Sequence, residues 1–420
     1  MKTLYRFNHI LITIVALFAI LAAQAGEFSR EFTDSKKVSN SDLMKIVTSH
    51  CKDLNIITTD KKEAKIVVTL TLDLDDAKLA EEVFQNVEYK IETTSEGVKM
   101  DVSSPFKSFT SSGSFWGSNY AKVVFKNGHK MDFNDDLEFD LRAKVYIPKS
   151  NKMSLDASHS NAELGFLSNS AEIKVSHSHL KASDMKELII KSSHSQTRVG
   201  NIEKDASMKM SHSRFNGLKI GGMTLSAQHS ILNLDMVSGN VKVNMQHSTL
   251  EMEDAGNIEV SSLQHSTLRA ENVKNIEANT IQHSSLIMEN AGDVQVDGTQ
   301  HSKIRLENIL SLRVGGGSHS NISVEEITDA VVISASHSNI SVEDLGENIK
   351  VVKVKNSHAS VSLGTGNVKN MDVYINDGKF TNVRNEGDLE KKSDGFYKKR
   401  SGSGDAIEVT INCPFCNVNL

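Results

Sequence analysis

The chain has little proline and few aromatic side chains: 3 prolines, 1 tryptophan and 5% aromatic residues in 420 positions. So little proline excludes a collagen and a mucin-like stalk. With 38% apolar and 24% charged residues, the chain does not have the composition of a charged, disordered polypeptide. It contains only one long apolar run, which excludes a membrane protein with several spans. What remains is a folded, mainly β, exported protein.

The single apolar run predicts a signal peptide at the N-terminus. Lys2 and Arg6 form a basic segment, residues 10–22 are apolar, and Ala23-Gln24-Ala25 is a small-x-small cleavage site. We therefore expect residues 1–25 to be removed and the mature chain to start at Gly26. An uncleaved anchor is the alternative.

The charge of the mature chain bears on its partners. Cleavage removes two basic and no acidic groups, so 45 Lys and Arg remain against 53 Asp and Glu, and the net charge changes from −6 to −8. This acidity argues against nucleic acid as a partner. No second apolar stretch is long enough to span a bilayer, so we expect no transmembrane segment after cleavage.

A short string centred on histidine recurs after residue 150. It reads Ser-His-Ser or Gln-His-Ser in eleven copies and Ser-His-Ala in the last, at intervals of 17 or 18 residues and finally 21. The twelve histidines, which we call the histidine ladder, are His159, His177, His194, His212, His229, His247, His265, His283, His301, His319, His337 and His358.

The period predicts the fold. An interval near 18 residues is too short for helix pairs or propeller blades and fits one coil of a β-solenoid. Val294 and Val296 alternate with polar residues, and so do Ile304 and Leu306, as half-buried strands require. We expect an all-β fold, a single-stranded parallel β-helix with ~18-residue coils and right-handed winding, in which coils stack at roughly 4.8 Å and equivalent residues lie above one another.

Each coil is expected to turn twice. One turn is expected at the histidine. The second is expected at Gly239-Asn240, Gly256-Asn257 and Gly292-Asp293, because these residue types tolerate left-handed backbone angles.

The histidine ladder has two interpretations. Strict alternation points His301 outward and Ser302 inward, but this assumes that no corner lies at the motif. Phe415 occupies the histidine register in Pro414-Phe415-Cys416, as does Phe380 in Lys379-Phe380-Thr381, and an aromatic is easier to understand at a packed corner. The first interpretation, which the phenylalanines favour, is a structural ladder of stacked imidazoles that bond to serine or backbone groups.

The second interpretation is an exposed, functional ladder. Neutral imidazoles about 5 Å apart could chelate Zn, Cu or Ni between adjacent coils, although no acidic residue recurs beside the histidine. In either orientation, protonation of many neighbours at once is repulsive, so the ladder should lose order below about pH 5.5 to 6.

We expect residues 26–150 to form an N-terminal cap together with the first coils. Residues 151–420 are expected to form the repeat solenoid and its closing coils. Asp75 to Tyr89 is the convincing amphipathic helix, with Leu79, Val83, Phe84 and Val87 on one side. This small α/β section is expected to cover the open strand edge of the solenoid.

Residues 103–120 are rich in serine and glycine yet carry several aromatics, which makes them a candidate contact loop. The residues are Phe106, Phe109, Phe115, Trp116 and Tyr120. They could stack on sugars or insert into a partner, or the loop could fold over the cap with its rings buried.

The chain has three cysteines, Cys51, Cys413 and Cys416. An odd number in an exported chain suggests one disulfide and one free thiol. The simplest pair is Cys413 with Cys416. Their CxxC spacing lacks the strand-to-helix setting that lowers a thiol pKa, so redox catalysis is not expected.

Several segments together resemble the putative-adhesin, β-strand-repeat family of bacterial exported proteins, which is related to the auto-transporter-adhesin-like head domain. They are Leu54 to Thr58, Ile66 to Leu70, Leu141 to Pro148 and Ser401 to Val409. The family's usual coil corner, a small or aromatic residue before glycine, is replaced here by histidine before serine. The resemblance implies a right-handed parallel β-helix with an envelope or surface role, and it supplies no catalytic residues.

We therefore expect a non-catalytic, exported solenoid with a structural or adhesive role, in the periplasm, at the cell surface or outside the cell. A cell-surface glycan or an envelope protein is the expected partner, and no cofactor is expected unless the ladder binds Zn or Cu. The alternatives are a metal-binding protein and a carbohydrate-active β-helix, and the latter is disfavoured because the coils carry no long loops.

Overall fold

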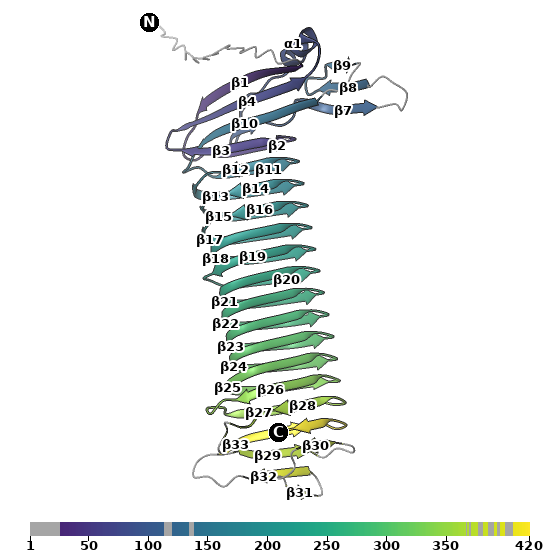
Figure 1. The fold of residues 1–420 in the computed structure, drawn as a ribbon. Coiled ribbons are helices and arrows are strands. Elements are labelled where there is room, and N and C mark those ends of the chain that lie inside the picture. Colours follow the sequence, from purple (N-terminus) through teal and green to yellow (C-terminus); the bar gives the residue numbers. More distant parts are fainter. Residues whose placement is uncertain are drawn as a thin grey trace, which may run out of the picture. The chain divides into compact units, whose positions relative to one another are not determined.

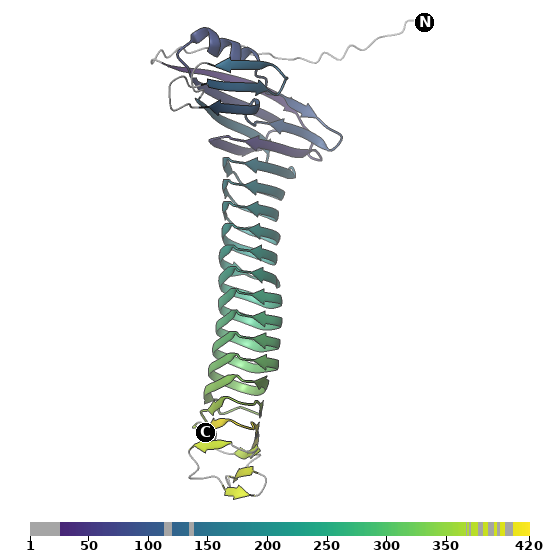
Figure 2. The same cartoon turned by 90° about the vertical axis from the view of Figure 1, so that its right-hand side faces the viewer.

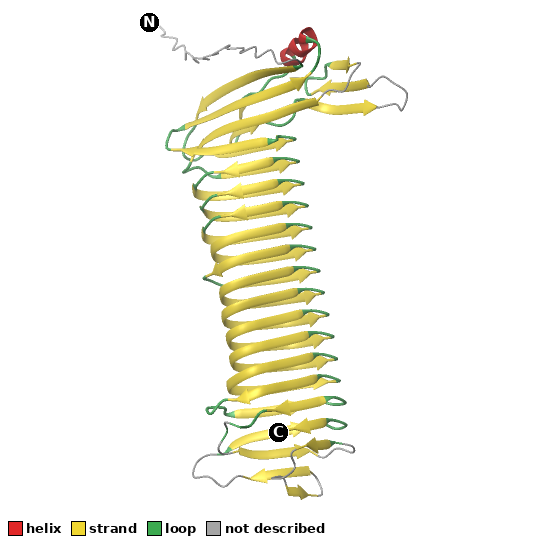
Figure 3. Cartoon of the chain, in the orientation of Figure 1, coloured by secondary structure: helices red, strands yellow, loops and turns green. Residues whose placement is uncertain are grey.

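The computed structural model describes residues 26–112, 120–133, 138–366, 368, 371–376, 381–384, 390–392, 395–399 and 406–420. The expected signal peptide, Phe115, Trp116 and Phe380 lie outside the described residues. The described part is built almost wholly of strands with a single helix (Figure 3), so the expected all-β class is confirmed. The chain forms two compact units, Met1–Asn169 with His177–His179, and Ser170–Ser176 with Leu180–Leu420.

The first unit contains the first coil of the solenoid and the strands that cover it. Its elements are β1 (Glu27–Lys37), β2 (Leu43–Ser49), β3 (Asp53–Thr59), β4 (Glu63–Asp73), α1 (Ala77–Gln85), β5 (Ile91–Thr93), β6 (Gly97–Asp101), β7 (Phe106–Ser112), β8 (Tyr120–Phe125), β9 (Lys130–Phe133), β10 (Glu138–Pro148), β11 (Met153–Ser158) and β12 (Asn161–Leu164).

Both edges of the first coil are paired. β2 and β3 form this coil on either side of His50, and β11 and β12 of the next coil lie parallel to them. On the opposite edge, β6 pairs with β2 and β10 pairs with β3, again in parallel. An antiparallel set continues from β10 to β4 and β1. The extra strands therefore leave no open edge on the first coil that could recruit another chain.

The helix α1 belongs to this covering section. The Asp76 side chain caps it by accepting a hydrogen bond of 2.8 Å from the backbone N–H of Lys78. Arg30 of β1 donates to Glu81, and its guanidinium carbon lies 4.8 Å from the centroid of the Phe84 ring. These contacts join the helix to the outermost strand of the antiparallel set.

The helix is shorter than the sequence predicts. The expected range was Asp75 to Tyr89, but the helix ends before Asn86, whose backbone N–H makes a tight bond of 3.1 Å to the carbonyl of Val83. Val83, Phe84 and Ala80 are buried, whereas Leu79 is only half-buried. Apolar residues beyond Asn86, including Val87, are buried without being helical.

The second unit is a stack of coils (Figures 1 and 2). The remaining strands of the chain are β13 (Leu167–Ser176), β14 (His179–Ala182), β15 (Met185–Ser193), β16 (Gln196–Val199), β17 (Ile202–Ser211), β18 (Arg214–Gln228), β19 (Ile231–Val237), β20 (Val241–Gln246), β21 (Thr249–Gln264), β22 (Thr267–Gln282), β23 (Ser285–Gln300), β24 (Lys303–Ser318), β25 (Asn321–Ser336), β26 (Asn339–Leu345), β27 (Val351–Lys355), β28 (Ser360–Leu363), β29 (Met371–Asn376), β30 (Asn382–Arg384), β31 (Glu390–Lys392), β32 (Gly395–Lys399), β33 (Ile407–Asn412) and β34 (Asn417–Asn419).

Successive coils of this stack pair in parallel with equivalent residues in register. Leu250 pairs with Leu268, Leu268 with Leu286, and Leu286 with Ile304. From β21 to β25 each coil is one strand of 16 residues, interrupted only at the histidine and the serine after it. The predicted parallel β-solenoid with ~18-residue coils is therefore confirmed.

The core is a set of apolar rows that run from coil to coil. Within this core, the third and fifth residues after the histidine point inward, as Ile304 (0% exposed) and Leu306 (1% exposed) show. The strand before the histidine contributes Val294 and Val296 from the opposite face. No coil can bury these residues alone, so burial of each row requires its neighbours above and below.

The end of the stack departs from chain order. β33 pairs in parallel with both β27 and β29, and β34 pairs with both β28 and β30. The last coil of the chain therefore lies between two coils that precede it in sequence.

The second turn, which we call the far corner, forms for a different reason from the one predicted. Among the described residues, the only glycines with positive φ are Gly26, Gly97 and Gly128, so no far-corner glycine adopts a left-handed conformation. A Cβ atom added to Gly256 would lie 2.4 Å from the carbonyl oxygen of Gly239, and one added to Gly292 would lie 2.2 Å from that of Lys274. The far corner needs glycine because adjacent coils approach closely there.

The close approach gives a stability prediction. Gly256→Ala should destabilise the fold by about 1 to 3 kcal/mol, because backbone must move to admit the methyl group. Gly298→Ala is the matched control, since a Cβ at Gly298 meets nothing closer than 3.4 Å. Thermal unfolding of both variants measures the difference, and equal melting temperatures would contradict the close-approach explanation.

Candidate functional site

The histidine ladder lies at a sharp corner of the backbone. All twelve ladder histidines have φ between 49° and 56°, which lies in the left-handed region. His50 (53°) and Phe415 (63°) lie in the same region. Histidine adopts this region several times more often than most side chains other than glycine, asparagine and aspartate. The corner expected at the motif is therefore present, and it lies at the histidine itself.

The corner sends histidine and serine to opposite sides of the chain. The ladder imidazoles are exposed, whereas Ser302 is 6% exposed and Ser338 is 0% exposed. Strict alternation therefore predicted the exposed side chains correctly, since His301, Lys303 and Arg305 all lie on the outside of the coil.

The exposed rings stack on one another. In the first unit, His50, His159 and His177 have successive centroid distances of 4.9 Å. In the second unit, successive rings from His194 to His358 lie 4.7–5.0 Å apart, nearly parallel, with the largest tilt of 21° between His301 and His319. The geometry thus combines features of the two interpretations: the rings stack at a corner, and they are exposed to solvent.

Phe415 continues the stack beyond His358 in the second unit. Its ring lies 4.7 Å from that of His358, because the last coil of the chain sits against the coil of His358. Cys413 and Cys416 on either side of it form a disulfide with Cα atoms 5.6 Å apart. Cys51 is a free thiol, and burial raises its pKa to about 11.

Serine completes the corner from the inside. The backbone N–H of Ser266 donates to Oγ of Ser284 in the next coil (3.0 Å), and its own Oγ donates to the carbonyl of Gln264 (2.7 Å). The same pair of bonds recurs along the ladder, at 3.0–3.3 Å and 2.6–3.0 Å respectively. A buried row of hydroxyls therefore satisfies the polar backbone groups of the corner.

The inward serine and the outward histidine do not form a nucleophile and base. Ser266 is 4% exposed, and its Oγ accepts from the backbone N–H of Ser248 and donates to the carbonyl of Gln264. The serine before the histidine does reach an imidazole: Ser158 Oγ lies 3.0 Å from His159 Nδ1, and Ser318 Oγ lies 2.8 Å from His319 Nδ1. These bonds orient the ring at the corner.

Two histidines of the stack, His50 and His229, have lowered pKa values. Desolvation, followed by the charge of His159, lowers the pKa of His50. Desolvation and then the charges of His212 and His247 lower the pKa of His229. Each added proton meets imidazolium neighbours one coil away.

The stacked geometry does not suit chelation between adjacent coils. A zinc ion with ligand distances of about 2.0 to 2.1 Å requires two ligand nitrogens no more than about 4.2 Å apart, with converging lone pairs. Parallel rings 4.8 Å apart, such as His229 and His247, direct equivalent lone pairs side by side. Among the described residues, no three His, Cys, Asp or Glu side chains are grouped as a metal site. A metal could be held only if rings rotated out of the stack.

The candidate contact loop is partly a small sheet. The expected loop over 103–120 instead contains β7, which pairs antiparallel with β8, as Phe109 with Val123 and Ser112 with Tyr120 show. Phe106 is half-buried and packs edge-on against Phe125 (5.4 Å) and Phe139 (5.0 Å). The loop prediction was therefore wrong for residues 106–112, which form the strand β7, and Phe106 is a packing residue.

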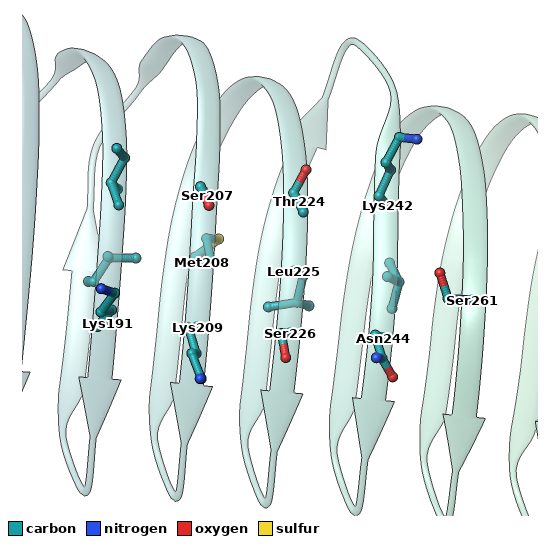
Figure 4. Close-up of a pocket in the computed structure, with 13 residues that line it drawn as sticks. Lys191, Ser207, Met208, Lys209, Thr224, Leu225, Ser226, Lys242, Asn244 and Ser261 are labelled. Carbon is teal, nitrogen blue, oxygen red and sulfur yellow. The ribbon is translucent and has the colours of Figure 1, made fainter.

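A groove on the second unit was not predicted. It has a volume of about 350 Å³ and crosses the strands that precede His194, His212, His229, His247 and His265 (Figure 4). Two rows of outward side chains form it: Ile189, Ser207, Thr224 and Lys242 in one, and Lys191, Lys209, Ser226 and Asn244 in the other. Short hydroxyl side chains between longer ones create the depression. Aligning the coils on histidine would have revealed these rows.

Comparisons with known proteins place the chain in no family. No protein-family model matches it, and no curated protein matches it. Among solved structures, a putative cell adhesion protein from Clostridium sporogenes aligns over 93% of this chain and 98% of its own at 10% identity, with a TM-score of 0.18. A putative lipid binding protein from Parabacteroides distasonis aligns over 80% and 96% at 13% identity, with a TM-score of 0.18. These TM-scores are too low for either likeness to bear on fold or function.

The corner conformation predicts a ranking of substitutions. His265→Val should destabilise the fold by about 1 to 2 kcal/mol, because a β-branched side chain is strained in the left-handed region, whereas His265→Asn should cost less. Thr267→Val, at an extended strand position of the same coil, serves as the control and should be nearly neutral. Melting temperatures test the ranking, and His265→Val as stable as His265→Asn would refute it.

The lowered pKa values predict acid sensitivity. A histidine whose pKa is lower in the folded chain binds fewer protons there than in the unfolded chain. Its stabilising contribution is therefore present above the ordinary histidine pKa of 6.5 and is lost as the pH falls through the lowered pKa. We expect the melting temperature to fall between pH 7.5 and pH 5, and less steeply in a variant with His212, His229 and His247 replaced by Asn. An unchanged melting temperature across this range would sink the prediction.

Proposed function

We propose that the protein is an exported, non-catalytic β-solenoid with a structural or adhesive role at the bacterial cell envelope. The observation that carries the proposal is the repetition of outward groups in register from coil to coil. A surface that presents the same group many times suits a partner that is itself repetitive, because many weak contacts then act together.

Near the far corner, asparagine side chains also repeat from coil to coil and bond to one another. Asn308 donates through its amide to Asn290 (3.2 Å), Asn290 donates to Asn272 (2.9 Å), and Asn272 donates to Asp254 (2.9 Å). The row lines an open depression of about 340 Å³. Fixed amides and imidazoles on two corners make a rigid surface of hydrogen-bonding groups, which supports binding or scaffolding.

We propose a non-catalytic role because the side chains that could act as nucleophiles are already hydrogen-bonded or disulfide-bonded. The serines beside the ladder are buried and engaged with the backbone, and Cys413 and Cys416 are joined to each other. Export rests on the N-terminal sequence, and the putative-adhesin resemblance favours a cell-surface glycan or an envelope protein as partner. Among the described residues, no helix is long and apolar enough to cross a membrane.

A second candidate function is metal binding, favoured by the exposure of all the ladder imidazoles. Titration of residues 26–420 with Zn, Cu and Ni at pH 7.5, with stoichiometry from elemental analysis, separates the candidates. The stacked geometry predicts no tight equivalents. Several tight equivalents per chain, lost when alternate ladder histidines become Asn, would establish metal capture instead.

Cell fractionation and binding test the main proposal. Tagged protein should lack residues 1–25 and should appear in the envelope or outside the cell. Purified residues 26–420 should bind intact cells or isolated envelopes without releasing products from a panel of polysaccharides. Retention in the cytoplasm would contradict the proposal, and polysaccharide cleavage would establish the carbohydrate-active alternative.

A further inference from the structure

The groove of Figure 4 differs in charge from the rest of the chain. Within five residues on either side of His194, His212 and His229 there are four basic residues, Lys191, Arg198, Lys209 and Arg214, and no acidic one, although the whole chain has a net charge of −6. All four side chains are exposed. The three coils therefore form a local cationic surface on an acidic protein.

The two groove lysines are adjacent and available. Lys191 and Lys209 pair directly across neighbouring coils, so their side chains leave the sheet side by side. Among the described residues, no carboxylate lies within ion-pair distance of either lysine, whereas Lys242 at the other end of the groove is paired with Glu259 at 2.7 Å. Two like charges held together without a counter-charge suit an anionic ligand.

The floor of the groove supplies hydrogen bonds and one apolar contact. Ser207, Thr224 and Ser226 present exposed hydroxyls between the lysines and Asn244. Ile189 is 45% exposed at the rim. Hydroxyls with an apolar edge match the alternating hydroxyl and C–H surface of a sugar ring.

The shape of the groove favours a chain over a small molecule. It is shallow and crosses five coils from Ile189 to Ser261, which at roughly 4.8 Å per coil corresponds to about 19 Å. No aromatic side chain lines it, so it lacks the stacking surface that single-stranded nucleic acids use.

We propose that this groove binds an acidic polysaccharide, with Lys191 and Lys209 contacting its carboxylate or sulfate groups and the hydroxyl row contacting its ring hydroxyls. Arg198 and Arg214, on the opposite side of the histidine corner, extend the attraction for the polyanion. This inference rests on the proposed adhesive function and names the class of its partner.

Calorimetric titration of residues 26–420 with heparin, polygalacturonate and neutral dextran at pH 7.5 tests the proposal. We expect binding of at least one of the two acidic polymers, weakened about tenfold by Lys191→Gln with Lys209→Gln and weakened by added salt. The control is Lys353→Gln with Lys355→Gln, which removes the same charge from two outward positions of one strand before His358 and should leave the affinity unchanged.

Three results would overturn the proposal: equal weakening by both double variants, binding of dextran as tight as that of the acidic polymers, or tighter binding of single-stranded DNA through the same two lysines. Circular dichroism of each variant establishes that the fold is intact.

Binding of the same proteins to intact cells separates this inference from the proposed function. Cell binding that neither acidic polymer competes and that the Lys191 and Lys209 substitutions leave unchanged would overturn the groove alone. Absence of all cell and envelope binding would overturn the adhesive role itself.

Discussion

Each coil whose histidine corner lies among the described residues depends on one residue whose backbone turns in the left-handed sense. Histidine occupies that position from His50 to His358, and Phe415 occupies it in the last coil. Glycine would satisfy the backbone alone, but it would add no side chain to the outside of the corner. Histidine accepts the conformation and also supplies a flat ring that stacks at the spacing imposed by the strands. One choice of residue therefore serves both the turn and the contact between coils.

The two sides of the corner depend on each other. Inside, the hydroxyl of a serine such as Ser266 links two coils: it accepts from the backbone N–H of Ser248 and donates to the carbonyl of Gln264. Outside, the imidazoles add contact between coils, but desolvation and then the charges of His212 and His247 lower the pKa of His229. The arrangement that holds the stack together near neutral pH thus becomes a source of repulsion in acid. The faces between the corners are free to vary, and it is on such a face that the lysine groove occurs.

The coils could be predicted from the sequence because the histidine motif repeats about every 18 residues and because buried and exposed positions alternate along each strand. Alternation at Val294, Val296, Ile304 and Leu306 identified the inward faces correctly. Composition alone could not reveal the reason for the far-corner glycines, because the contact that requires Gly256 is made by the carbonyl of Gly239 in another coil.

Relations between coils were the hardest to predict. The insertion of the last coil beside His358 depends on pairing among distant strands. The groove was missed for the same reason, since Lys191 and Lys209 are 18 positions apart and become neighbours only once the coils are aligned. Likewise, the strand β7 at Phe106 could not be predicted, because its sequence lacks the apolar–polar alternation of a half-buried strand and its serines are typical of turns.

Amide hydrogen exchange at the histidine corners tests the central claim most directly, namely that these turns are rigid junctions between coils. At pH 7.5 the backbone N–H of Ser266, which donates to Ser284 Oγ, should exchange as slowly as the amides of β22 on either side of Leu268. The exposed turn at Lys61 should exchange rapidly and provides the reference. Exchange at Ser266 as rapid as at Lys61 would mean that the corners open freely and would contradict the account.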